Sequence, residues 1–178
     1  MTPPLRPPLD LLVVAASHGE NLRLAERFVA AAEQQGLRAE VLDLSLSDLP
    51  LFTSRSERQQ PLPALESLEG RLRQAPRWVI CAPEYNGSIP PVLSSAIAWL
   101  SVQNEDFRSL FNGRPVAIAT HSGGGGYTLI TALRLQLAHL GAEVMGRYLV
   151  SNASRPAKDE SIADLVQRLA QLQPMQLP

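Results

Sequence analysis

Short apolar segments that suit buried strands alternate with amphipathic segments along most of this chain. The runs at 11–16 and 77–82 contain β-branched residues and few polar ones, as is typical of strands buried on both faces. We expect further strands at 38–44, 116–120 and 142–150. Because strands that alternate with helices form parallel sheets, the pattern predicts an α/β fold with a five-stranded parallel sheet and helices on both faces.

Helical periodicity fills the intervals between these strands. An apolar stripe at helical spacing runs through 21–35 and ends at Gly36. We predict the remaining helices at 65–74, 91–103, 127–140 and 161–172. The helix after residue 91 is apolar around more than one face, which suggests a contact between subunits.

Two other parts of the chain break the alternation. The segment 45–63 has no clear period and is predicted to be a long, partly solvated loop, a kind of segment that is more often functional than idle. We interpret residues 1–178 as one domain, with loosely ordered ends at 1–9 and 174–178.

Composition excludes several classes of function. The formal net charge is −1 and the basic residues are scattered, so we expect no nucleic-acid partner. Cys81 is the single cysteine, which excludes an intrachain disulfide and suits a reducing compartment. The three histidines lack the spacing of metal ligands, and no apolar run is long enough for a membrane span. These observations predict a cytoplasmic protein without a metal and without a membrane partner.

The turn after the third predicted strand is the most informative motif. Residues 82–91 read APEYNGSIPP and offer the carboxylate of Glu84, the phenol of Tyr85 and the carboxamide of Asn86. In open α/β sheets, ligands bind at the carboxyl ends of the strands, where this turn should lie. The prolines alone would explain a turn and a helix start, but they do not explain the polar residues before them.

The turn after the first strand opens directly into a helix. It contains Ser17, His18, Gly19 and Asn21, and its N–H groups together with the helix dipole suit a phosphate. The alternative is that Ser17 or Asn21 only caps the helix and that His18 is an ordinary exposed loop residue.

The turn after the fourth strand contains Ser122 and four consecutive glycines from Gly123 to Gly126. Glycines let the backbone approach a ligand closely, so the N–H groups of Gly123 and Gly124 could meet a heterocycle or an anion. A flexible turn before the next helix is the alternative. The absence of a Gly-x-Ser-x-Gly sequence argues against a hydrolase nucleophile at Ser122.

The sequence PEYNGSIP at 83–90, with the apolar residues of the helix that follows, resembles the central motif of the NADPH-dependent FMN reductase family. That resemblance implies a flavodoxin-like, three-layer fold with strand order 2-1-3-4-5, FMN as the bound cofactor and NADPH as the reductant. It also implies a homodimer or homotetramer. In the family the first loop usually carries an Arg, whereas residues 16–21 read ASHGEN, which leaves His18 and the backbone N–H groups for the phosphate.

By position, the resemblance implies three groups of FMN-binding residues. The first loop would hold the phosphate through Ser17, His18, Gly19 and Asn21. The isoalloxazine and ribityl chain would lie along the second loop, at Pro83, Glu84, Tyr85 and Asn86. The pyrimidine edge would face the third loop, at Ser122, Gly123 and Gly124. No catalytic acid, base or nucleophile is predicted, because the cofactor would carry the chemistry.

The leading hypothesis is therefore an NAD(P)H oxidoreductase that reduces bound FMN and passes the electrons to a flavin, quinone, azo compound or metal oxyanion. One alternative is a flavodoxin-type electron carrier, although such carriers tend to be strongly acidic and this chain is not. The other is a binding or regulatory protein that kept the fold without the flavin.

Overall fold

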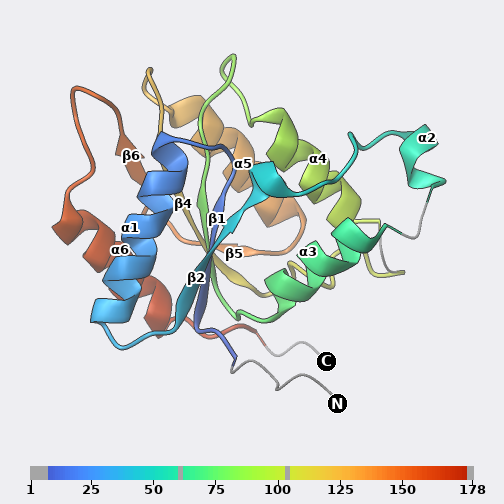
Figure 1. The fold of residues 1–178 in the computed structure, drawn as a ribbon. Helices are drawn as coiled ribbons and strands as arrows, with labels where there is room; N and C mark the ends of the chain where they lie inside the picture. Colours follow the sequence, from blue (N-terminus) through green and yellow to red (C-terminus); the bar gives the residue numbers. More distant parts are fainter. Residues whose placement is uncertain (1–7, 60–61, 103–104, 176–178) are drawn as a thin grey trace.

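The computed structural model describes residues 8–59, 62–102 and 105–175 and contains one twisted parallel sheet (Figure 1). The strands lie in the order β2-β1-β3-β4-β5, and β6 also pairs with β4, every pair being parallel. This arrangement confirms the α/β class and the 2-1-3-4-5 order. The strands are β1 (Leu11–Ala15), β2 (Ala39–Asp43), β3 (Trp78–Cys81), β4 (Pro115–His121), β5 (Glu143–Val144) and β6 (Leu149–Ser151).

Helices cover both faces of the sheet and make the three layers that the resemblance implied. One face packs against α1 (Glu20–Gln34) and α6 (Asp159–Gln171). The other packs against α3 (Pro63–Arg73), α4 (Pro91–Leu100) and α5 (Tyr127–His139).

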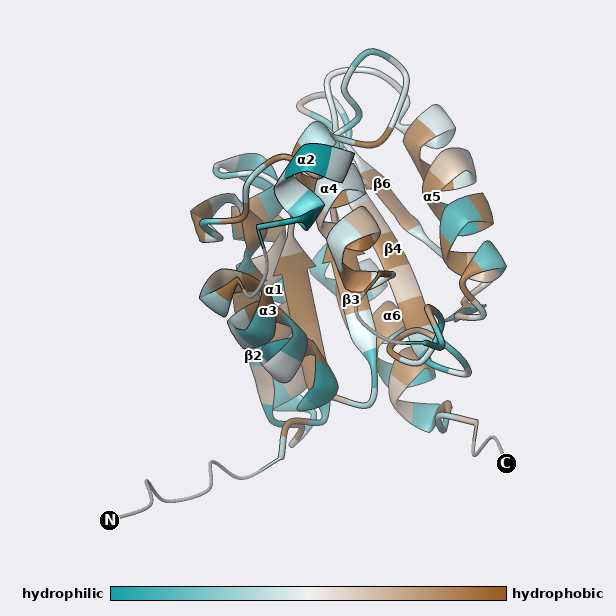
Figure 2. Cartoon of the chain, turned by 90° about the vertical axis from the view of Figure 1, so that its right-hand side faces the viewer, coloured by the Kyte–Doolittle hydropathy of each residue, from teal (hydrophilic) through white to brown (hydrophobic). Residues whose placement is uncertain are grey.

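Successive side chains of each strand enter different cores, because neighbouring residues of a strand point to opposite faces. Leu12 and Val14 pack under α3, α4 and α5, whereas Leu11 and Val13 pack under α1 and α6. Figure 2 shows the result, with apolar strands enclosed by helices whose outer faces are more polar. The continuous apolar runs at 11–16 and 77–82 therefore identified β1 and β3 correctly.

The last strand is interrupted, which corrects the prediction of one strand over 142–150. Val144 pairs with Val116 and Leu149 pairs with Ala119, so four residues, 145–148, lie opposite only two, 117–118. The surplus residues cannot keep the ladder and bulge away from it. The sequence predicts a continuous strand over 142–150 because it does not show how many residues of β4 are available for pairing.

The wide apolar surface of α4 is covered by the chain itself. The indole N–H of Trp99 donates to the carbonyl oxygen of Pro50 at 2.7 Å, and the N–H of Phe52 donates to Ser95 Oγ at 2.8 Å. The rings of Phe52 and Trp99 meet edge to face with centroids 5.1 Å apart. We call residues 49–52 the strap. The strap therefore accounts for part of the apolar surface of α4 within a single chain.

The segment 45–63 contains more structure than the predicted loop. The 3₁₀ turn η1 (Leu44–Leu46) follows β2, and a short helix α2 (Ser54–Glu57) follows the strap. Thr53 and Ser56 exchange the hydrogen bonds of a capping box at the start of α2.

The ends that were predicted to be loose, 1–9 and 174–178, lie largely outside the described residues. Within the described part, Leu9 is buried and its N–H donates to Gln74, while the N–H of Met175 donates to Gly113. Among the helices that the structure describes, none has the length and apolarity needed to cross a bilayer.

Candidate functional site

The three polar turns predicted to form a site leave the same end of the sheet. They follow β1, β3 and β4 and lie together at the top of Figure 1. Parallel strands require this, because all their carboxyl ends point the same way. The turns are residues 16–19, 82–90 and 122–126, here called the first, second and third loops.

Asn21 joins the first loop to the end of β4. Its Nδ2 donates to the carbonyl oxygen of His121 at 2.9 Å, and its Oδ1 accepts from the N–H of His121 at 2.9 Å. Asn21 is buried, and both polar groups of its carboxamide have a backbone partner. The contact of Asn21 with a phosphate stays a prediction, and its side chain already has this structural role.

The first loop leaves the start of α1 without a side-chain cap. Gly19 occupies the N-cap position with φ 99°, a conformation that residues with a Cβ avoid. The first N–H groups of a helix have no partner within the helix, so those of α1 face this edge uncapped. Next to them, His18 is exposed, and its Nδ1 lies 3.3 Å from Oδ2 of Asp43. Glu20 forms an ion pair with Arg23.

The second loop folds back as a tight hairpin. Tyr85 and Ser88 exchange both backbone hydrogen bonds, at 3.1 and 3.0 Å, around Asn86 and Gly87. Asn86 has φ 51° and Gly87 has φ 67°, which is the pattern of a type I′ turn and explains the Asn-Gly pair. Tyr85 is half exposed at the tip, and Pro83 at the base is buried.

The third loop is tied to the second through Ser122. The buried Ser122 hydroxyl accepts from the N–H of Glu84 at 2.7 Å and lies 2.8 Å from Oγ1 of Thr120. The carboxylate of Glu84 then accepts from the N–H of Leu129, in the first turn of α5, at 3.0 Å. Gly123 and Gly124 are exposed, and no described residue accepts a hydrogen bond from either N–H group.

The model of the NADPH-dependent FMN reductase family matches residues 9–155, which include all three loops. The chain belongs to this family.

Two curated proteins with similar sequences are informative. A quinone reductase from Escherichia coli K12 is 39% identical over 106 residues, a match that covers 58% of this chain and 55% of the relative. An NADPH azoreductase from Bacillus sp. OY1-2 is 29% identical over 126 residues, covering 70% of this chain and 67% of the relative. The chain thus spans about half the length of the matched quinone reductase.

Solved structures agree on the fold. FerB, a flavoenzyme NAD(P)H:(acceptor) oxidoreductase from Paracoccus denitrificans, superposes with a TM-score of 0.73 at 21% identity, over 91% of this chain and 94% of that one. A flavodoxin from the domain Archaea superposes with a TM-score of 0.56 at 13% identity, over 90% of this chain and 92% of that one. These likenesses confirm the flavodoxin-like fold.

Two polar residues of this FMN reductase family member were missed from the sequence. Asp43 ends β2 and holds His18; burial tends to raise its pKa, but hydrogen bonds from the hydroxyl and N–H of Ser45 and from His18 keep the pKa below the usual 3.8. Ser151 ends β6, and its hydroxyl donates to the carbonyl oxygen of Thr120 at 3.0 Å. Both residues stand at carboxyl ends of strands, which is the signal that could have identified them.

Cys81 is the last residue of β3, and its side chain packs in the core under α1 and α6 and does not line the three loops. It is buried, and burial raises the pKa of its thiol far above the usual 9.0, so the group stays protonated and unreactive. The Cys81 side chain thus serves as a small core group.

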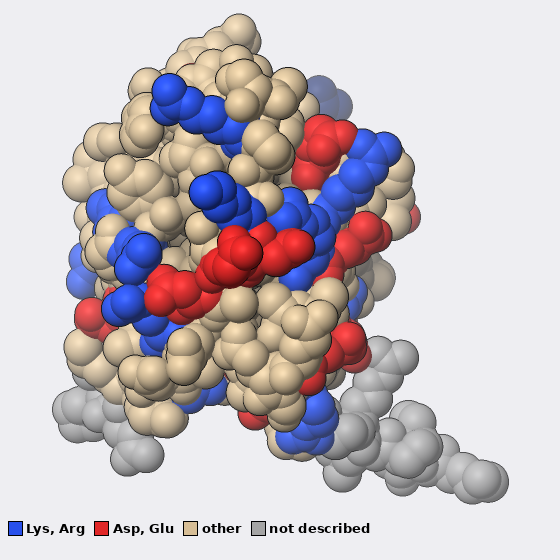
Figure 3. Space-filling model, turned by 90° about the vertical axis from the view of Figure 1, so that its left-hand side faces the viewer, with Lys and Arg blue, Asp and Glu red and all other residues tan. Residues whose placement is uncertain are grey.

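Charges on the α1 and α6 side of this family member are mixed in sign. Figure 3 shows this side, where acidic and basic side chains lie next to one another. Among them, Arg27 pairs with Asp159 at 2.6 Å, and Arg168 pairs with Asp164 at 3.0 Å. No single-sign field covers this side.

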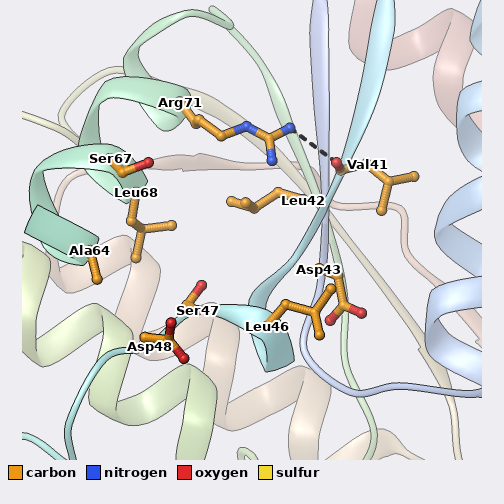
Figure 4. A pocket seen from close by; sticks show the side chains of 10 residues that line it. All are labelled: Val41, Leu42, Asp43, Leu46, Ser47, Asp48, Ala64, Ser67, Leu68 and Arg71. Carbon is orange, nitrogen blue, oxygen red and sulfur yellow. Dashed lines mark hydrogen bonds between the residues drawn. The ribbon is translucent and has the colours of Figure 1, made fainter.

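A hollow of about 460 Å³ lies between β2, η1 and α3 and adjoins only the first of the three loops (Figure 4). Leu42 and Leu68 form its apolar floor, and Arg71 closes one end by donating to the carbonyl oxygen of Val41 at 3.1 Å. Asp43 lies at the other end and is shared with the first loop through His18.

Proposed function

We propose that the chain binds FMN at the edge formed by the three loops and acts as an NAD(P)H oxidoreductase. The family match and the quinone reductase and azoreductase relatives support this proposal. When bound, FMN would supply the ring that takes a hydride from NAD(P)H and passes electrons to a flavin, quinone, azo or metal-oxyanion acceptor.

The uncapped start of α1 carries the proposal. Its free N–H groups suit a phosphate dianion, and Ser17, His18 and Gly19 surround them. Three carboxylates nearby would repel an anion if they faced it, but each has a partner. Glu20 pairs with Arg23, and Glu84 accepts from the N–H of Leu129. Asp43 accepts from Ser45 and lies 3.3 Å from Nδ1 of His18. The residues present therefore fit a phosphate-bearing ligand.

The other two loops supply surfaces for a ring system. We propose that residues 83–86 lie along the isoalloxazine and ribityl chain, with the exposed ring of Tyr85 beside them. The unpaired N–H groups of Gly123 and Gly124 would donate to the carbonyl-rich pyrimidine edge. The links through Asn21 and Ser122 hold this edge in place without a ligand, which reduces the entropic cost of binding.

We further propose a cytoplasmic homodimer or homotetramer. The single cysteine, which is unpaired, suits a reducing compartment. Because the strap covers the Trp99 side of α4, we propose that the contact between subunits involves another surface. The exposed apolar residues Leu135 and Tyr127 on α5 are available for it. Sedimentation of the purified chain tests the assembly.

Spectroscopy with and without reductant tests the enzyme. Added FMN should lose its fluorescence on binding, and FMN should bind roughly tenfold or more tightly than riboflavin because of the helix N-terminus. In the absence of oxygen, NADPH should bleach the flavin absorbance within seconds. Binding without bleaching would favour the electron carrier, and failure to bind FMN would favour the flavin-free protein.

A further inference from the structure

We propose that Glu84 is a positioning residue, which caps α5 from another loop and thereby sets the arrangement of the third loop. The idea rests on the proposed function for its effect on FMN. It goes beyond the contact implied by the family resemblance: the backbone of Glu84 would lie along the flavin with the rest of the second loop, whereas its carboxylate binds the backbone of α5.

The first step is that α5 cannot supply its own cap. The N-cap residue, Gly126, has φ 67° and makes no side-chain bond to the helix. A Cβ at this position would lie 2.7 Å from Cγ2 of Thr120, so Ser, Thr, Asn or Asp would clash there. The residue types that normally cap a helix are thus excluded from this position.

The second step is that Glu84 replaces the missing cap. Leu129 is the third residue of α5, where an N-cap side chain would normally accept a hydrogen bond, and its N–H donates to Oε2 of Glu84 at 3.0 Å. The negative charge also lies at the positive end of the helix dipole. Glu84 thus performs for α5 both functions of an acidic N-cap, although 45 residues separate the two partners.

The third step is that the same residue holds both ends of the third loop. At the start of the loop, the N–H of Glu84 donates to Ser122 Oγ at 2.7 Å. Past its end, the Glu84 carboxylate fixes Leu129. The glycines between these two anchors have no side chains that could fix the loop. The directions of their N–H groups therefore depend on the two anchors. Oε1 of Glu84 lies 3.9 Å from where a Cβ of Gly124 would stand, so the carboxylate also lies alongside the loop.

Amide hydrogen exchange of the flavin-free protein tests the cap directly. Glu84→Ala should speed the exchange of the Leu129 N–H about tenfold, the size of a typical capping contribution. Glu84→Gln keeps an acceptor oxygen and should restore most of the protection. Glu66→Ala is the matched control, because Glu66 is an exposed acid in the first turn of α3, away from the edge. Circular dichroism verifies that each variant is folded.

Titration with FMN tests the consequence. Glu84→Ala should raise the Kd for FMN about tenfold or more, Glu84→Gln should raise it less than about threefold, and kcat at saturating FMN should change little, because the loss is one of positioning. Unchanged exchange of Leu129 in Glu84→Ala would overturn the proposal. An equal loss of FMN affinity in both variants, with exchange protected in Glu84→Gln, would also overturn it, since the charge would then contact the ligand.

The two proposals fail separately. If the wild-type protein binds no FMN, the proposed function is wrong, whereas the exchange rates still decide whether Glu84 holds α5 and the third loop.

Discussion

Asn21 and His121 are joined by two hydrogen bonds of 2.9 Å although 100 residues separate them in the chain. The carboxamide of Asn21 binds the backbone of His121 as a neighbouring strand would, with one donor and one acceptor. It therefore links the start of α1, next to the first loop, directly to the end of β4, where the third loop begins, although β3 lies between β1 and β4 in the sheet.

Replacing Asn21 should destabilise the fold. Asn21→Ala removes both of these partners from the N–H and C=O of His121, which is partly buried, and we expect a loss of about 2 kcal/mol in the free energy of unfolding. Urea denaturation of the flavin-free protein measures it. Gln34→Ala, an exposed change on the same helix, should change stability by less than about 0.5 kcal/mol. Equal effects of the two changes would contradict this role for Asn21.

Substitutions at two glycines distinguish the effect of backbone conformation on stability from the effect of steric crowding. Neither Gly87 nor Gly146 has an atom within 4 Å of an added Cβ, but only Gly87 has a positive φ, of 67°. Gly87→Ala should therefore lose about 1 kcal/mol from strain in the turn. Gly146→Ala should be neutral or stabilising by about 0.5 kcal/mol, through a less flexible unfolded chain. Thermal melts compare the two, and a destabilised Gly146→Ala would refute the distinction.

The strap should depend on the ring of Phe52. Phe52→Ala removes the edge-to-face contact with Trp99, and we expect a loss of about 1 to 3 kcal/mol, since Phe52 is only partly buried. Limited proteolysis should then cut faster near α2. Leu51→Ala is the control, because Leu51 lies in the same strap with its side chain exposed. A strap that is equally resistant in both variants would show that Phe52 does not anchor it.

Stability should fall in acid partly through Asp43. The pKa of Asp43 lies below 3.8 in the folded chain and near 3.8 when the chain is unfolded, so the charged form stabilises the fold above that value. This contribution is lost as the pH falls through the folded pKa. In Asp43→Asn the dependence of unfolding free energy on pH should be shallower below about pH 4.5. Chemical denaturation between pH 2.5 and 7 measures the slope, and an unchanged slope would contradict the prediction.

Local pattern was sufficient for the elements that are apolar on both sides. Val13, Val79 and Ala117 stand in runs without polar interruptions, so β1, β3 and β4 could be placed within one or two residues of their ends. The strand order needed the family resemblance, because nothing in an apolar run says which strand lies beside it.

Long-range contacts explain what the sequence did not show. The apolar faces of α4 suggested a second subunit, yet Phe52 and Pro50, more than 40 residues earlier, cover Trp99. The roles of Asn21 and Glu84 likewise depend on partners from other loops. An Asn or a Glu can bind a ligand or a backbone group equally well. Only the three-dimensional arrangement shows which of these contacts is present.

The links among the loops also set an order for assembly during protein synthesis. A nascent chain that has not passed β4 contains the first two loops but neither His121 nor Ser122 to hold them. Asn21 and the N–H of Glu84 then have only water as a partner. A ligand that binds the completed edge should therefore bind the emerging polypeptide only weakly. Binding should follow the release of β4 from the ribosome.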